Sequence, residues 1–411
     1  MRMWIYVVRR LILLIPIIVG VMTITFILVS SLPVVDQLTA YYGPPPQRGR
    51  TWLYDNPIPC SLLNASQKGE CTNPYYEKLL ANLGLNLPLP EQWAKYMYRA
   101  LTFQWGTVDN HSTAGTTAAN GIAAGHPVIQ VLAWFLPYTL ELAVLALIII
   151  LAVSIPLGNL SAVYRNRPID QASRIMSFSG YAMPSFLLAS LILMALVLGL
   201  GPVVGYGVKT PWCPTGETIY DEFYGSWPIQ QCFANGVYPA WLVQGVISSP
   251  TGFPTIDAMI HGQYWMAVDT LIRMIFPAIV IAFISIAGLL RFVRNSMLEV
   301  MNLDFIRTAR AKGVPEPTVI KRHAGRNSLN VTITVLGLTF AFFIGGFPVI
   351  EEVFGLKGVG YLLALSVQKT QYPIDFGLIF GSVLLFTYIV VIANIIVDVL
   401  YAYLDPRVRL G

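Results

Sequence analysis

Few residues in this sequence combine in a way that would support catalysis. The four histidines lie far apart, at His111, His126, His261 and His323. None has the two or more carboxylate, cysteine or histidine neighbours that a local metal site would need. The sequence also lacks the G-x-x-x-x-G-K-[ST] loop that holds nucleotide phosphates, and it has no nucleophile elbow. We therefore expect a non-catalytic chain that binds no cofactor or metal itself, so that any energy input comes from another polypeptide.

The cysteines suggest structural rather than catalytic chemistry. They form two locally spaced pairs, Cys60 with Cys71 and Cys213 with Cys232, each within a long segment rich in polar and aromatic residues. No CxxC or Cys/His cluster indicates zinc. Disulfides persist in oxidising compartments, so we expect two bridges, Cys60–Cys71 and Cys213–Cys232, if these segments face outward. Four free thiols are the alternative.

The composition is that of a membrane protein. Of 411 residues, 55% are hydrophobic and only 11% are charged, whereas about a quarter are charged in soluble domains. The net charge of +5 is not gathered into one basic run, so nucleic acid is not an expected partner. Six apolar stretches are long enough to cross a bilayer as helices: residues 9–32, 133–160, 173–200, 268–290, 328–350 and 376–403. We predict an all-α integral membrane protein with six transmembrane helices.

The distribution of Lys and Arg predicts the topology. Short basic segments occur before the first helix, between the second and third, between the fourth and fifth, and after the sixth, which places both termini in the cytoplasm. The apolar run after Arg9 and Arg10 is long for a signal core and lacks an A-x-A exit, which favours an uncleaved helix. The predicted organisation is a cytoplasmic N-terminus and first helix at 1–32, an extracellular segment at 33–132, helices 2 and 3 at 133–200, an extracellular segment at 201–267, and helices 4 to 6 at 268–411 with a cytoplasmic loop at 291–327.

The cytoplasmic loop between helices 4 and 5 is too polar to span and strongly patterned. Phe305, Ile306, Ala309 and Val314 form a predicted apolar side, opposite Arg307, Arg310 and Lys312. Gly313 is expected to end a first short helix, and Pro315 and Pro317 fit the start of a second over 318–323. The pattern predicts two short helices lying along the membrane surface.

The sequence of this loop resembles a known family. The run Thr308-Ala309-Arg310-Ala311-Lys312-Gly313, followed by His323 and Arg326-Asn327, is similar to the signature loop of ABC importer permeases of the dipeptide/oligopeptide/nickel branch. Ordered similarities extend along the chain, from Pro137-Tyr138-Thr139-Leu140-Glu141 through Asp170 and Met183-Pro184-Ser185-Phe186 to Leu404-Asp405-Pro406-Arg407.

The resemblance implies a type I importer fold and a set of partners. These are a second homologous permease subunit, ATP-binding cassette subunits that hold ATP and Mg²⁺, an extracellular solute-binding protein and the lipid bilayer of the cell membrane. It also implies that the loop is a coupling helix inserted into an ATP-binding subunit, through Phe305, Arg307, Thr308, Ala309, Arg310, Ala311, Lys312, Gly313, His323 and Arg326. The solute stays open among peptides, oligosaccharides and nickel.

Several alternatives remain at this point. Glu141, Pro184 and Asp398 lie within predicted spans and serve either the solute pathway or helix packing. We expect Met183-Pro184 to break its helix, and broken helices in transporters tend to line a cavity. The aromatic residues of the outer segments build either disulfide-stapled caps with an interfacial belt or a docking surface for a solute-binding protein. A passive channel or a membrane scaffold with extracellular docking domains is the alternative function.

Overall fold

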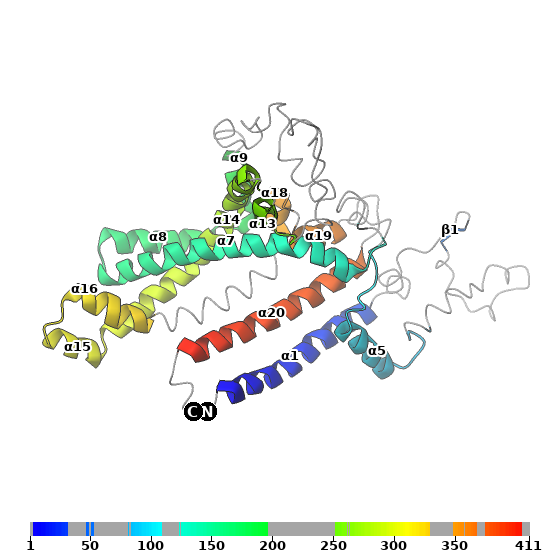
Figure 1. Ribbon diagram of the computed structural model, residues 1–411, viewed down its shortest axis with the longest axis horizontal. Helices are drawn as coiled ribbons and strands as arrows, with labels where there is room; N and C mark the ends of the chain where they lie inside the picture. Colours follow the sequence, from blue (N-terminus) through cyan, green and yellow to red (C-terminus); the bar gives the residue numbers. More distant parts are fainter. Residues whose placement is uncertain are drawn as a thin grey trace, which may run out of the picture.

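The computed structural model describes residues 3–31, 47–48, 51–52, 81, 84–108, 123, 125–195, 251–260, 262, 264–328, 348–356, 358–367 and 375–404. These residues are almost entirely helical (Figure 1). Within them the only strands are β1 (Gln47–Arg48) and β2 (Thr51–Trp52), an antiparallel pair in which Gln47 lies opposite Trp52.

Three described helices are long and apolar enough to cross a membrane. They are α7 (Val128–Val163), α14 (Tyr264–Met301), whose apolar part begins at Met274, and α20 (Phe376–Leu404). Each contains a predicted span, and α14 continues well past its predicted end at 290. The first predicted span falls in α1 (Met3–Ser30). The fifth lies almost wholly outside the described residues, so the count of six stays a prediction.

The third predicted span is not one straight helix. It is divided into α8 (Pro168–Ala182) and α9 (Ser185–Ala195), which meet at an angle of 104°. The break follows from Pro184, because the residue before a proline is disfavoured in helical geometry. Met183 accordingly has φ −93° and ψ 121°. The break expected at Met183-Pro184 is confirmed, so the span predicted over 173–200 is a bent pair within the described residues.

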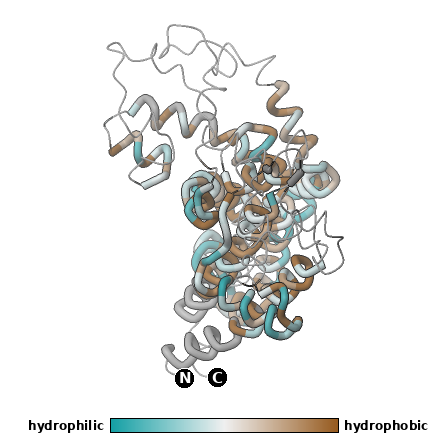
Figure 2. The backbone as a smooth tube through the Cα atoms, turned by 90° about the vertical axis from the view of Figure 1, so that its right-hand side faces the viewer, coloured by the Kyte–Doolittle hydropathy of each residue, from teal (hydrophilic) through white to brown (hydrophobic). Residues whose placement is uncertain are grey.

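The helices pack closely where their sequences are small. α14 lies along both α7 and α8, and Figure 2 shows apolar residues along the bundled helices. A Cβ at Gly158 of α7 would lie 2.7 Å from the side chain of Val293, and one at Gly180 of α8 would lie 2.5 Å from Ala287 Cβ. Close backbone approach at small residues is how helices associate within lipid. The three helices therefore form one tightly packed unit.

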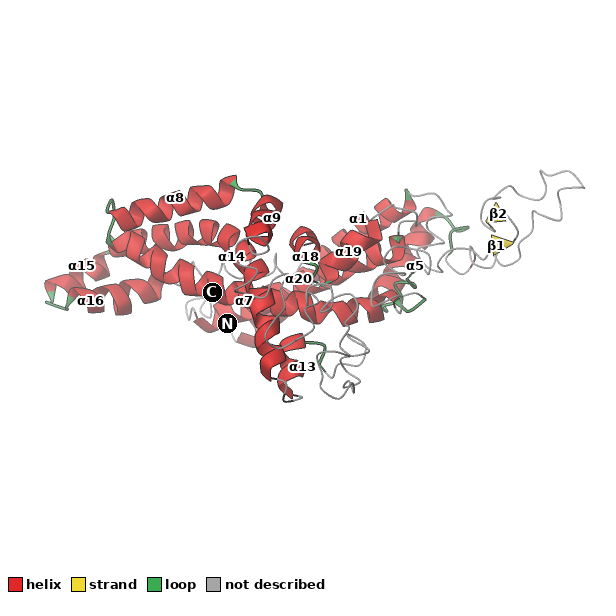
Figure 3. Ribbon diagram, turned by 90° about the horizontal axis from the view of Figure 1, so that it is seen from above, coloured by secondary structure: helices red, strands yellow, loops and turns green. Residues whose placement is uncertain are grey.

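Shorter helices occupy the two ends of this bundle. At one end are α15 (Asp304–Ala311), α16 (Glu316–Thr318) and the π-helix η6 (Val319–Ala324), and at the other is α5 (Leu89–Leu101) (Figures 1 and 3). α13 (Pro254–Ile260) packs on α14, and α18 (Pro348–Phe354) packs on α9 and on α19 (Val359–Val367). α1 lies beside α20. All four cysteines, and with them both predicted disulfides, lie outside the described residues.

Candidate functional site

The polar segment after α14 folds as two short helices, as predicted. α15 ends at Ala311 with Lys312 as its C-cap, and Gly313 follows with φ +74°, a left-handed conformation that glycine adopts without strain. Its N–H donates to Arg310 O at 2.9 Å. Pro315 then precedes α16, which continues into η6. We call residues 303–328 the α15–η6 loop.

The loop is packed onto the ends of α7 and α14. Buried Ile306 and Ala309 of α15 and Val319 and Ala324 of η6 share one apolar cluster with Ala162 of α7 and with Met297 and Val300 of α14. Val314 packs partly buried against this cluster, as predicted. The prediction was wrong for Phe305, which is 40% exposed. Only positions 306 and 309, one helical turn apart, face the bundle.

Most of the predicted coupling residues of the loop are exposed. Apart from buried Ala309 and half-buried His323, all are exposed: Phe305, Arg307, Thr308, Arg310, Ala311, Lys312, Gly313 and Arg326. Arginine and aromatic side chains are enriched at protein interfaces. Most of the predicted residues are therefore accessible on this short segment, and they present four cationic side chains and a phenyl ring.

One ion pair joins the two halves of the loop. Arg310 donates to both carboxylate oxygens of Glu316, at 2.6 and 3.1 Å. The guanidinium holds the pKa of Glu316 below its usual value, and the hydrogen bonds to the carboxylate raise the pKa of Arg310. Both side chains are exposed, so the pair contributes little to stability, but its two-pronged geometry fixes how α16 leaves α15.

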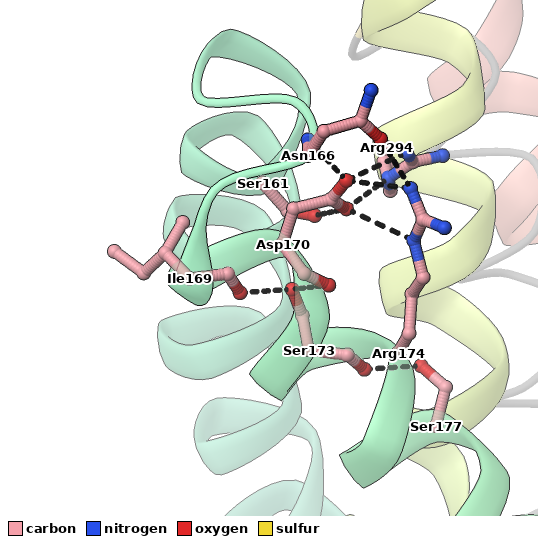
Figure 4. A network of polar contacts seen from close by, with 8 residues as sticks. All are labelled: Ser161, Asn166, Ile169, Asp170, Ser173, Arg174, Ser177 and Arg294. Atoms are coloured by element: carbon pink, nitrogen blue, oxygen red, sulfur yellow. Dashed lines mark hydrogen bonds and ion pairs between the residues drawn. The ribbon is translucent and has the colours of Figure 1, made fainter.

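A buried carboxylate lies near the ends of α7 and α14 that support the loop, and Figure 4 shows its polar contacts. Asp170 of α8 is completely buried. It accepts hydrogen bonds from Arg294 of α14 at 2.7 and 3.1 Å, from Arg174 at 2.7 and 3.4 Å, from Ser161 Oγ of α7 at 2.7 Å and from Asn166 N at 2.9 Å. We call these five residues the Asp170 cluster.

The Asp170 cluster connects the same helix ends that support the loop. Ser161 is next to Ala162 in α7, and Arg294 lies one turn before Met297 in α14. Ala162 and Met297 both belong to the apolar cluster against which the loop packs. A buried ion is tolerated only when its hydrogen-bonding capacity is filled, and both oxygens of Asp170 are bonded. The ends of α7, α8 and α14 are thus tied together by charge as well as by packing.

Sequence reasoning missed this cluster. In the sequence, Asp170 stands out only through the family resemblance, and Arg174 and Arg294 belong only to the basic segments that predict the topology. One signal was present, because Asp170 and Arg174 are four residues apart on a helix, the spacing of a helical ion pair. The partner on α14 is 124 residues away, and no spacing rule reaches that far.

A second buried carboxylate, also missed, joins α7 to α18 and α19. Glu351 is completely buried and accepts hydrogen bonds from Thr139 Oγ1 and from the backbone N–H of Tyr361, both at 2.9 Å. Thr139 Oγ1 in turn accepts from Val359 N at 2.9 Å. We call these four residues the Glu351 cluster.

The residues predicted for the pathway or for packing are not gathered together. Glu141 is half-buried on α7, where Thr255 N of α13 lies 3.5 Å from its carboxylate. This contact is an interhelical packing contact. Pro184 is exposed at the bend between α8 and α9. Asp398 belongs to α20, but its side chain lies outside the described residues.

Comparisons with known proteins agree with this arrangement. Residues 154–410 match the model of the binding-protein-dependent transport system inner membrane component. The chain is 33% identical to the probable D,D-dipeptide transport system permease protein DdpB of Escherichia coli K12, over 88% of this chain and 92% of that protein.

Two further relatives match over nearly their whole length. The oligopeptide transport system permease protein AppB of Bacillus subtilis is 30% identical, over 98% of this chain and 99% of that protein. The dipeptide transport system permease protein DppB of E. coli K12 is also 30% identical, over 98% of both chains. Together with the apolar helices, these matches show that the chain is a multi-pass membrane protein of the binding-protein-dependent transport system inner membrane component family.

Proposed function

We propose that this chain is the transmembrane permease subunit of an ATP-driven, binding-protein-dependent importer of peptides or similar solutes. The names of its relatives support a peptide cargo, with oligosaccharides and nickel as the other classes that the resemblance implies. The chain itself would be non-catalytic. ATP and Mg²⁺ would be held by separate ATP-binding subunits, and an extracellular protein would deliver the solute.

The observation that carries this proposal is the seating of the α15–η6 loop. Its exposed face, with Phe305, Arg307 and Arg310, is free to contact a partner. Its opposite face is bound to α7 and α14 through Ile306 and Ala309. A displacement of the loop would therefore be passed to both helices instead of being absorbed by a flexible connection.

The Asp170 cluster would extend this displacement to a third helix. Because Asp170 of α8 bonds Arg294 of α14, the first helix of the bent pair would move with α14. The 104° break at Pro184 would let α9 keep a different orientation while α8 moves. Closure of the ATP-binding subunits would thus favour one of two helix arrangements, through its differential affinity for them, and access would alternate between the two sides.

The proposed topology follows from the same assignment. The α15–η6 loop and both termini would lie in the cytoplasm, and α5 would lie at the outer end. The two cysteine pairs would form disulfides in the oxidising exterior. A second, homologous permease subunit would complete the pathway.

The test compares alanine substitutions on and off the loop. Arg307→Ala and Arg310→Ala should assemble with the ATP-binding subunits yet lose the stimulation of ATP hydrolysis by loaded binding protein. Arg291→Ala removes a matched exposed arginine from α14 outside the loop and should leave that stimulation unchanged. Unaltered ATP-coupled uptake in both loop variants would remove the loop from the mechanism, and solute flux without any ATP-binding partner would favour a channel.

A further inference from the structure

The helix α5 presents an exposed face whose character changes along its length. Its buried face consists of Tyr96, Met97 and Ala100. On the exposed face, the first half carries the charged Glu91 and Lys95 beside Leu89, whereas the end of the helix and the next turn carry Thr102 and Gln104 and, as their large side chains, Tyr98, Leu101 and Phe103. These last three side chains are 64%, 52% and 50% exposed. Three neighbouring large apolar groups on an outer face form an exposed patch of the kind that marks contact with a membrane, a ligand or another protein.

The contacts of α5 place its apolar end beside a spanning helix. Tyr388 of α20 donates a hydrogen bond to Ala100 O at 3.2 Å, and its ring lies 5.4 Å from that of Phe103. Tyr388 is twelve residues into the apolar span that begins at Phe376, or about 18 Å along the helix axis. Helix side chains lean toward the N-terminus, so the ring lies somewhat nearer the start of α20. The apolar end of α5 is thus level with hydrocarbon, not with water.

The contacts of α5 with a second apolar helix, α1, lead to the same placement of α5. Trp93 Nε1 donates to Thr23 Oγ1 of α1 at 3.1 Å, and the rings of Tyr96 and Phe26 lie 5.6 Å apart. These α1 positions alternate with Ile24 and Ile27, whose side chains are exposed. Ile24 and Ile27 therefore add exposed apolar side chains on α1, the helix against which α5 packs.

The backbone beyond α5 is suited to a medium without water. Thr102 N bonds Tyr98 O at 2.9 Å, Phe103 N bonds Ala100 O at 3.4 Å, and Gln104 N bonds Arg99 O at 2.9 Å. Ala100 O also accepts from Trp105 Nε1 at 3.0 Å. Inside a bilayer each backbone polar group must find its partner within the protein, and the N–H groups of Thr102, Phe103 and Gln104 do so.

We propose that α5 is inserted obliquely into the lipid leaflet at the end of the bundle opposite the α15–η6 loop. Glu91 and Lys95 remain at the headgroups, and Tyr98, Leu101 and Phe103 lie against acyl chains. The occupant of this face is thus lipid, and not the solute-binding protein or a second permease. Naming this leaflet the outer one rests on the proposed topology, but the insertion itself does not.

The experiment is photo-crosslinking of the full chain within its purified complex, reconstituted in phosphatidylcholine vesicles. p-Benzoylphenylalanine replaces Phe103, Tyr98 or, as the matched control on the charged half, Glu91. Irradiation should give phospholipid adducts at positions 103 and 98. Saponification of these adducts should leave a fatty acid on the chain, which identifies an acyl-chain contact. Position 91 should give no fatty-acid adduct.

Adducts at 98 and 103 to another protein, to another segment of this chain, or to no lipid would overturn the proposal. So would equal fatty-acid labelling at position 91, because the helix would then lack the charged-to-apolar gradient in depth. If the variant at 103 does not assemble, position 98 decides, since its largely exposed ring is not required for packing.

Discussion

Two buried carboxylates at different places in the bundle are stabilised in different ways. Asp170 is bonded by two guanidinium groups, a hydroxyl and a backbone N–H. Glu351 is bonded by the hydroxyl of Thr139 and by backbone N–H groups, all of them neutral. Both are completely buried. The Asp170 cluster therefore depends on ionic charge, and the Glu351 cluster depends on hydrogen bonds to a carboxyl group that is costly to ionise.

This difference in stabilisation matches the helices that each cluster connects. The Asp170 cluster ties three helix ends behind the α15–η6 loop, where a proposed mechanical load enters. The Glu351 cluster closes the turn between α18 and α19 over α7. Its ionisation state can change near neutral pH, whereas Asp170, between two cations, stays ionised. We therefore expect the Asp170 cluster to be rigid and the Glu351 cluster to be sensitive to protonation.

The largest effect is expected from Asp170→Ala. It leaves the largely buried guanidinium of Arg294 without its carboxylate, at a cost of about 3–5 kcal/mol. Thermal unfolding of the purified complex measures the loss. Apolar replacement of both partners, Asp170→Leu with Arg294→Met, should recover part of it because no charge is then stranded. A loss of stability no larger than that of Arg307→Ala, at an exposed arginine, would show that the Asp170 cluster does not stabilise the bundle.

A smaller effect should come from titration of Glu351. Burial raises its pKa from 4.5 to about 7, so the folded protein binds this proton more tightly than the unfolded chain. The resulting stability is present in full below pH 4.5 and is lost as the pH rises to about 7. The difference of 2.5 between these pKa values (7 minus 4.5) corresponds to at most roughly 3–4 kcal/mol.

Unfolding temperatures between pH 5 and pH 8 measure this dependence. They should fall with rising pH in the native chain and fall less in Glu351→Gln, which cannot ionise. If Glu351→Gln reproduces the native slope, the titrating group lies elsewhere, and the contrast with Asp170 fails.

The backbone around Glu351 gives a third, still smaller effect. A Cβ at Gly358 would collide with the carboxyl group of Glu351. Gly358→Ala should therefore destabilise the protein by about 1–3 kcal/mol, the usual cost of overpacking. Gly20→Ala is the control, because nothing lies within 4 Å of a Cβ there. Equal unfolding temperatures for the two variants would mean that the turn yields easily and that the Glu351 cluster is not rigid.

Local signals in the sequence predicted much of the fold but neither the Asp170 cluster nor the Glu351 cluster. Long apolar runs predicted α7, α14 and α20, and Pro184 predicted the bend, because these features act within one or two helical turns. Gly313 and Pro315 likewise predicted the two short helices of the loop. Thr139 and Glu351, by contrast, are 212 residues apart. A buried hydrogen bond between them depends on how whole helices pack, and a hydropathy pattern does not encode that.

The smallest effect should come from Glu316→Gln, which tests whether burial or pairing makes Asp170 important. Arg310 and Glu316 form the same kind of two-pronged ion pair, at 2.6 Å, but both side chains are exposed. Water and salt screen such a pair, so its loss should cost about 1 kcal/mol or less, and less still at high ionic strength. Unfolding temperatures at low and high salt measure this. A loss comparable to that of Asp170→Ala would contradict the argument from burial and would instead mean that the geometry of the α15–η6 loop itself holds the helix ends together.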